Sequence, residues 1–205
     1  GSNIPFRQKI VDELAYSFAI GDFYYYVVDF ATLQMLYVSE SVRQVLGVDA
    51  PDFTVDKILD IMHPEDVRMM RVKEEAAMNF LFNKIKPEDI PEYKVIYMMR
   101  ILDKNGNYKK ILHQVRAIRM SDNNKIEWVL GIHSDISGLG ISFEHKISLL
   151  SHSRPSFIAI DPNELTYEDH SIPQLFTKQE QKIIFLLAEG KRAVEIAELL
   201  HLSEH

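Results

Sequence analysis

Residues 93–120, YKVIYMMRILDKNGNYKKILHQVRAIRM, carry the clearest structural signal of the chain. Branched and aromatic residues, which favour strands, are frequent on both sides of Asn105-Gly106. Asn-Gly between two such runs is typical of a hairpin, because both residues tolerate positive φ. We therefore predict two antiparallel strands, at residues 93–103 and 108–120, joined by a tight turn.

Three more strand-like segments surround this hairpin. Residues 127–136 (EWVLGIHSDI) follow it after a polar turn, and residues 23–30 (FYYYVVDF) and 34–39 (QMLYVS) precede it. Apolar residues with helical spacing lie between the two groups, at residues 42–46, 54–62 and 67–85. This order predicts an α+β domain: one five-stranded antiparallel sheet with helices packed over one face.

Length and composition limit the class of protein. With 205 residues the chain is long enough for one full core and a smaller module. It contains no Cys, which excludes disulfides, thiolate metal sites, cysteine nucleophiles and cysteinyl cofactor adducts. The formal net charge is −7, so a DNA-binding function must rest on a motif rather than on charge.

The sequence divides into four segments. Residues 1–19 are interpreted as a tag-cleavage scar, Gly1-Ser2, and an entry helix. Residues 20–138 hold the α+β domain, and residues 139–173 are rich in breakers and predict a linker, with 156–160 (SFIAI) as a candidate extra strand. Residues 174–205 predict a small all-α segment.

This last segment has the pattern of two short helices and the start of a third. Thr177-x-x-Glu180 is a capping box, and the apolar residues after it end at Gly190. Residues 195–200 begin a second helix, and Ser203 is placed to cap a third. The spacing predicts a helix-turn-helix whose recognition helix, which reads base edges, would lie almost wholly beyond His205.

Four motifs in the first part of the chain resemble PAS domains. Residues 37–47 (YVSESVRQVLG) are similar to their strand-to-helix step, and residues 63–66 (HPED) to their His-Pro-acidic-Asp element. Residues 100–108 resemble the central hairpin, and residues 131–137 the Gly…Asp-Ile-Thr ending. The resemblance covers roughly residues 20–138. It implies a sensor that binds a small ligand or partner, or that mediates dimerisation.

Residues 176–203 resemble the LuxR-type DNA-binding domain, on the pattern FTxxE…LLAxG…EIAxxLxLS. The resemblance implies phosphate or turn contacts by Thr177, Lys191, Arg192 and Ser203, with DNA as the partner of the full-length protein. Arg192 and Val194 depart from the family, which usually has Ser or Thr and Lys there. Outside a helix-turn-helix, Lys191 and Arg192 would simply be a solvated surface pair.

His113 is the candidate for ligand binding. In the predicted strand it lies an even number of positions from Ile111, Val115 and Ala117, so all four side chains project from the same face. His113 therefore faces either a pocket or a hydrogen-bonded core. The Met pairs at residues 69–70 and 98–99 fit an adaptable apolar lining or an ordinary core equally well.

His63, with Glu65 and Asp66, raises the possibility of a metal or hydrolytic site. We prefer a helix N-terminus with favourable acids, because no second ligand cluster or nucleophile lies nearby, and we predict no metal. PAS domains that bind haem usually take the ligand from the long helix, here residues 67–85, which holds no His. Adduct-forming flavin needs a Cys, so we expect no cofactor. An unidentified small ligand in the pocket stays open, and so does a flavin bound without an adduct, although the Asn/Gln-rich signature of flavin-binding members is absent.

These features predict a cytoplasmic, homodimeric bacterial transcription regulator in which a PAS sensor controls a LuxR-type DNA-binding domain. The alternative is a non-catalytic PAS interaction module whose C-terminal helices pack rather than bind DNA. An enzyme is not expected, because no nucleophile–base pair or phosphate-binding Gly loop is present, and no stretch suits a membrane span. The 205-residue chain itself should not bind DNA sequence-specifically, since base contacts need the recognition helix.

Overall fold

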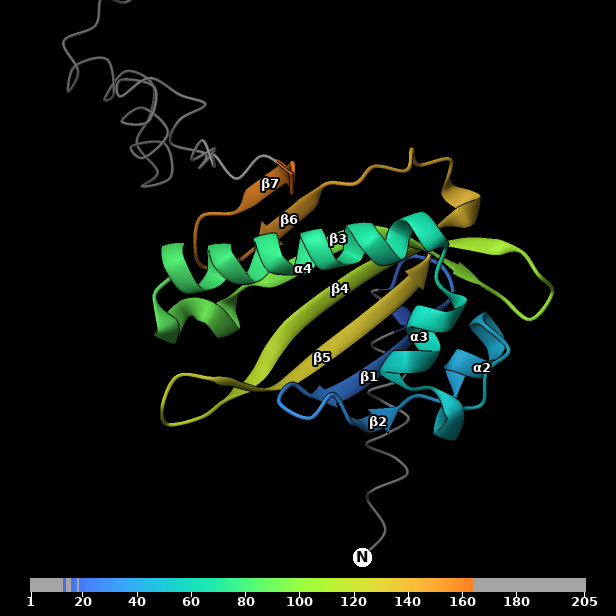
Figure 1. Cartoon of the computed structure of the whole chain (residues 1–205), viewed down its shortest axis with the longest axis horizontal. Coiled ribbons are helices and arrows are strands. Elements are labelled where there is room, and N and C mark those ends of the chain that lie inside the picture. The colour runs from blue at the N-terminus through green and yellow to red at the C-terminus, as the bar shows by residue number, and fades with distance from the viewer. Residues whose placement is uncertain (1–12, 14–15, 18, 164–205) are drawn as a thin grey trace, which may run out of the picture.

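The computed structural model describes residues 13, 16, 17 and 19–163. Its described part contains one seven-stranded sheet in the order β2-β1-β5-β4-β3-β6-β7, with every neighbouring pair antiparallel (Figure 1). The strands are β1 Phe23–Asp29, β2 Met35–Val38, β3 Lys94–Leu102, β4 Tyr108–Met120, β5 Ile126–Asp135, β6 Ile147–Leu150 and β7 Phe157–Ile160.

The helices between β2 and β3 lie on one side of this sheet (Figure 1). They are α2 Ser41–Val45, α3 Val55–Ile61 and α4 Pro64–Lys84, and 3₁₀ turns occur at Ala50–Asp52, Pro87–Glu92 and Ser137–Leu139. Local chemistry sets two of the starts. The Thr54 side chain accepts a hydrogen bond from the Lys57 backbone N–H at 3.0 Å, and Pro64 occupies the first turn of α4.

The predicted α+β class and the antiparallel sheet with helices on one face are confirmed. The strand number and the linker need correction, because β6 and β7 lie within residues 139–173 and extend the sheet. The β7 strand corresponds to the candidate extra strand at 156–160, whereas β6 was not expected. Its four residues give too short an alternation to recognise, although Ile147 and Leu149 are fully buried.

The strand β6 forms because β3 has a free edge. Residues Lys94 to Tyr97 pair with Leu150 to Ile147 along that edge. Further along, α4 supplies the partners: Lys73 Nζ donates to the Met98 carbonyl at 2.8 Å, and Asp66 accepts from the Arg100 backbone N–H at 2.7 Å. Unpaired backbone groups on a sheet edge are costly when buried, and here both kinds of partner satisfy them.

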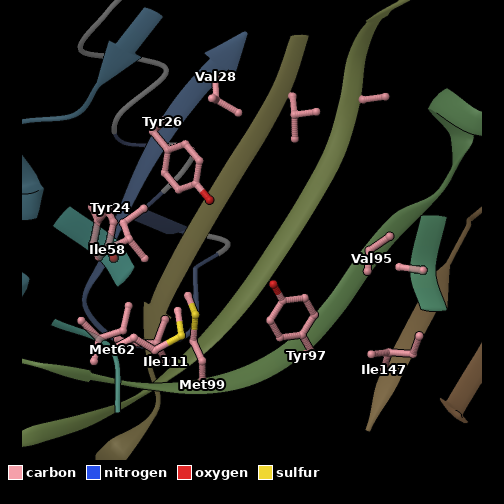
Figure 2. Packing of buried hydrophobic residues seen from close by; sticks show 14 of the residues in the cluster. Tyr24, Tyr26, Val28, Ile58, Met62, Val95, Tyr97, Met99, Ile111 and Ile147 are labelled. Atoms are coloured by element: carbon pink, nitrogen blue, oxygen red, sulfur yellow. The ribbon is translucent and has the colours of Figure 1, made fainter. Parts of the chain in front are cut away.

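The core lies between the sheet and the helices (Figure 2). Alternate residues of β1, namely Tyr24, Tyr26 and Val28, point into it, as the period of two in a strand requires. Gly131 on β5 pairs with Tyr26, and a Cβ at Gly131 would lie 2.6 Å from the Tyr26 hydroxyl oxygen. The large ring of Tyr26 therefore needs a glycine opposite it.

Two predicted elements lie outside the described residues. Of the predicted entry helix only residues 13, 16 and 17 are described, and they are helical. The predicted helix-turn-helix at residues 174–205 lies entirely outside the described residues. The same holds for its four candidate DNA contacts, Thr177, Lys191, Arg192 and Ser203. Within the described part, no helix is both long and apolar enough to cross a membrane.

Candidate functional site

A cavity of about 440 Å³ lies between the inner face of the sheet and helices α3 and α4. Apolar side chains form most of its wall, among them Met70, Met78 and Met99. Its polar lining includes Tyr26, Glu74, Tyr97, His113 and His133, whose side chains contact one another. A concave, mostly apolar space with a few polar groups is the usual form of a small-molecule site.

The strand register places four polar residues in a row across the sheet. Tyr24 of β1 pairs with His133 of β5, His133 pairs with His113 of β4, and His113 pairs with Tyr97 of β3. All four side chains project from the same face because directly opposite residues in an antiparallel pair share a face. Four consecutive neighbouring strands thus carry one continuous row of hydrogen-bonding groups.

Short contacts join this row. The Tyr24 hydroxyl lies 2.6 Å from His133 Nδ1, and His133 Nε2 lies 2.6 Å from His113 Nδ1. The Tyr26 hydroxyl is 3.3 Å from His133 Nε2. The rings of Tyr97 and His113 pack with their centroids 4.3 Å apart.

The helix α4 adds a carboxylate to the row. The Tyr97 hydroxyl donates to Glu74 Oε1 at 2.5 Å, and the same oxygen lies 3.8 Å from His113 Nε2. That separation is too long for a hydrogen bond, and within the part of the chain that the structure describes His113 Nε2 is buried without a hydrogen-bond partner. Glu74 stands at the mouth of the cavity, where its side chain keeps 40% of its surface exposed.

Burial keeps the histidines uncharged. Desolvation, with a smaller contribution from the positive charge of Lys73, lowers the pKa of His113 to about 3. Desolvation also lowers the pKa of His133 well below its ordinary value, and the neighbouring His113 acts in the same direction. Both imidazoles are therefore neutral at physiological pH.

Burial acts in the opposite sense on the acidic groups of the row. Desolvation raises the pKa of the Tyr24 and Tyr97 hydroxyls well above the usual value, so both keep their protons. Desolvation also raises the pKa of Glu74, although the hydrogen bond from Tyr97 partly opposes this. The tyrosines and histidines of the row are consequently neutral, and the acidic and basic side chains that line the cavity are Glu74, Glu75 and Arg116.

The structure places His113 where strand parity predicted, in the cavity wall, and it is also hydrogen-bonded within the core. Sequence analysis missed His133, although its alternation with Gly131 and Val129 puts it on the same face. It also missed Glu74, which only the packing of α4 brings to the cavity. Of the methionine pairs, Met70 and Met99 line the cavity.

The second cluster, around His63, is structural. His63 caps α4, with its Nδ1 accepting from the Glu65 backbone N–H at 3.3 Å, which agrees with the preferred interpretation as a helix N-terminus. Asp66 accepts from Arg100 Nη2 at 2.6 Å, and Glu65 from the same group at 2.9 Å. The residues described include no group of three or more His, Asp or Glu placed to hold a metal ion.

An antiparallel sheet with one helix-covered face, closed over an apolar cavity that holds a few polar groups, defines a sensor-type α+β domain. Residues 35–133 match the family model described as the PAS fold. This part of the chain is a PAS domain. A comparison with curated proteins finds no match.

Several solved structures are similar. The N-terminal PAS/PAC sensor domain of a diguanylate cyclase from Marinobacter aquaeolei shares 21% identity over 56% of this chain and 95% of that chain, with a TM-score of 0.42. A sensory box histidine kinase/response regulator from Burkholderia thailandensis E264 shares 19% identity over 62% and 84%, with a TM-score of 0.43. Drosophila melanogaster Cycle PAS-B with bound ethylene glycol shares 14% over 55% and 98%, with a TM-score of 0.41.

Proposed function

We propose that this PAS domain senses a small molecule in its inner cavity and controls a LuxR-type DNA-binding segment, in a homodimeric, cytoplasmic transcription regulator of bacterial type. The observation that carries the sensing part is the cavity itself, with the buried and unpartnered Nε2 of His113 in its wall. A buried polar atom without a partner costs free energy, and a ligand that pairs with it recovers that cost. In this proposal the domain acts by binding and not by catalysis.

The elements that form the cavity also hold the strands that lead to the C-terminal segment. Tyr97 and Val95 of β3 line the cavity, and the same stretch of β3 pairs with β6. On β7, Phe157 packs against Phe80 of α4 with ring centroids 4.5 Å apart, and the Tyr93 hydroxyl donates to the Pro155 carbonyl at 3.0 Å. A ligand that shifts β3 or α4 would therefore shift β6 and β7, provided it binds the two arrangements with different affinity.

The DNA-binding part of the proposal rests on the resemblance of residues 176–203 to the LuxR-type domain. The alternative, an interaction module without DNA binding, is favoured by two features of the same segment. Arg192 and Val194 replace residues usual in that family, and residues 176–205 carry four basic against five acidic side chains. Few phosphates would be neutralised by such a segment.

Native mass spectrometry of the purified protein tests the sensing part. A retained small molecule is expected on the wild-type chain and should be lost from Ala77→Leu, because Ala77 lines the cavity and the larger side chain occupies it. Asn79→Leu is the matched control, since it adds the same side chain at an exposed position of the same helix. Equal retention by wild type and Ala77→Leu would place the molecule elsewhere and contradict the proposal.

Fluorescence anisotropy with a randomised duplex library tests the DNA-binding part. The full-length protein should select a pseudo-palindromic site with a pronounced salt dependence. Ala77→Leu should alter the effect of the retained molecule on this affinity. No selection with or without that molecule would favour the interaction module instead.

A further inference from the structure

The hydrogen-bond row fixes which nitrogens of the two histidines carry protons. The Tyr24 side chain is fully buried and its hydroxyl keeps its proton. This hydroxyl lies 2.6 Å from His133 Nδ1, and it has no other hydrogen-bond partner among the described residues. The Tyr24 hydroxyl must therefore donate to His133 Nδ1, because a buried O–H without an acceptor is costly. His133 is neutral, so its one proton lies on Nε2.

The same reasoning determines which nitrogen of His113 carries its proton. The Nε2–H group of His133 donates to His113 Nδ1, at 2.6 Å. Since His113 is also neutral and its Nδ1 accepts, its own proton lies on Nε2. That Nε2–H group is buried and has no hydrogen-bond partner among the described residues, and His113 lines the cavity. The row thus ends in a donor that faces the ligand space.

Tyr26 supplies a second donor. Its hydroxyl oxygen lies 3.3 Å from His133 Nε2, where a donor is already present, so this contact leaves the Tyr26 hydrogen free to point elsewhere. The side chain lines the cavity, and Figure 2 shows the hydroxyls of Tyr26 and Tyr97 directed toward one another across it. The interior therefore offers hydrogen-bond donors without an acceptor for them.

Charge at the rim narrows the class of ligand further. An anion on His113 Nε2 would lose its hydration, and the ionised form of Glu74, whose Oε1 lies 3.8 Å from that nitrogen, would add repulsion. An ammonium group has donors only and cannot accept from His113 or Tyr26. An uncharged oxygen acceptor avoids both conflicts.

We propose that the cavity selects uncharged molecules with an apolar body and a hydrogen-bond-accepting oxygen of the ketone, ester or quinone type, which accepts from His113 Nε2 and the Tyr26 hydroxyl. This inference rests on the proposed sensing function and names its ligand class. The mostly apolar wall binds the body of such a molecule, and the two donors orient its oxygen.

Equilibrium dialysis with four naphthalene probes of similar size tests the ligand class. The probes are methyl naphthyl ketone, isopropenylnaphthalene, naphthoate and naphthylethylamine, which present an acceptor, no polar group, an anion and a cation. The ketone should bind at least about 5-fold tighter than the hydrocarbon, because each of its two hydrogen bonds contributes about that factor. The two charged probes should bind about 10-fold or more weakly than the ketone, because burying a charge without a partner is costly.

Variants assign the preference to the named groups. His113→Phe should reduce the preference for the ketone over the hydrocarbon, because the Tyr26 hydroxyl can then accept from His133 while its own hydrogen still reaches the ligand. Tyr26→Phe should reduce the preference and serves as the test if His113→Phe does not fold. Tyr37→Phe is the matched control, because it removes a hydroxyl from an exposed tyrosine that neither belongs to the row nor lines the cavity.

The outcomes separate this inference from the proposed function. If none of the four probes binds, both the proposed ligand class and the proposed sensing function are contradicted. If the ketone and the hydrocarbon bind equally, or if naphthoate or naphthylethylamine binds best, the ligand class is wrong while the cavity remains a binding site. A preference for the ketone that is unchanged in both His113→Phe and Tyr26→Phe would also overturn the assignment of the donors.

Discussion

The contact between Gly131 and Tyr26 gives a prediction that can be worked out from the structure. A Cβ at Gly131 would meet the Tyr26 ring, at 2.6 Å from the hydroxyl oxygen and 2.7 Å from Cε1, and closer still to Cζ. Real Cβ atoms do not approach this near, so Gly131→Ala must push the ring aside. Tyr26 is 6% exposed, and the cavity is the space beside it into which the ring can move.

We expect Gly131→Ala to lower the free energy of unfolding by about 1–3 kcal/mol, the usual cost of overpacking a core. In a Tyr26→Leu background the colliding ring atoms are absent. There the same change should stabilise the protein by about 0.5 kcal/mol, because Ala loses less backbone entropy on folding than Gly and Gly131 does not have positive φ. The coupling between the two positions is then about 1.5–3.5 kcal/mol.

Urea unfolding of the four proteins of this double-mutant cycle measures the coupling. Two results would refute the reasoning. A neutral Gly131→Ala in the wild type would mean that the Tyr26 ring does not lie over Gly131. An equal cost in the Tyr26→Leu background would place the strain in the backbone of β5 rather than in the ring.

Three further predictions concern α4. Asp66→Asn should cost about 2 kcal/mol at neutral pH by weakening the bonds from Arg100. Although burial favours its protonated form, these bonds hold the pKa of Asp66 below its usual value, so the difference in urea unfolding should close as the pH falls through that pKa. Burial lowers the pKa of Lys73 to about 8 in the folded protein, whereas the pKa of a lysine in the unfolded chain is about 10.4. Between these two pH values the unfolded chain binds more protons than the folded protein. The free energy of unfolding of the wild type should therefore rise with pH over this range relative to that of Lys73→Met. Ala76 and Ala77 are equally buried, but only Ala77 lines the cavity. Ala77→Leu should therefore lower the thermal midpoint of unfolding less than Ala76→Leu does, because the cavity has room for the larger side chain. The reverse order would contradict the position of the cavity.

The central hairpin could be predicted almost to the residue because its signals are local. The predicted strands, 93–103 and 108–120, compare with Lys94–Leu102 and Tyr108–Met120 in the structure. Gly106 has positive φ, and the Asp103 side chain accepts from the backbone N–H groups of Asn105 and Asn107 at 2.8 and 2.9 Å. Each of these side-chain contacts joins residues at most four positions apart.

The extension of the sheet could not be predicted because it depends on another element. The strand β6 has only four residues, and a Ser lies in its alternation. It forms where β3 leaves an edge that α4 does not cover, and no pattern within residues 139–173 reveals that edge. Breaker residues around it made the segment resemble a linker.

The candidate site was predicted only in part for the same reason. Strand parity placed His113 on the inner face, but its partners come from distant parts of the chain. His133 is 20 residues away, and Tyr24, which sets the tautomer of His133, is 109 residues from it. Glu74 comes from α4, whose contact with Tyr97 joins residues 23 apart. A hydrogen-bond row across four strands becomes visible only once their register is known.

Long-range ¹H–¹⁵N correlation spectra of the histidine side chains test the central claim, a neutral donor aimed into the cavity, most directly. We predict that His113 and His133 each carry one proton, on Nε2, and that their signals stay unchanged through the physiological pH range. Adding methyl naphthyl ketone should shift the His113 Nε2–H signal. Proton location on His113 Nδ1, or a charged His113 near neutral pH, would contradict the account.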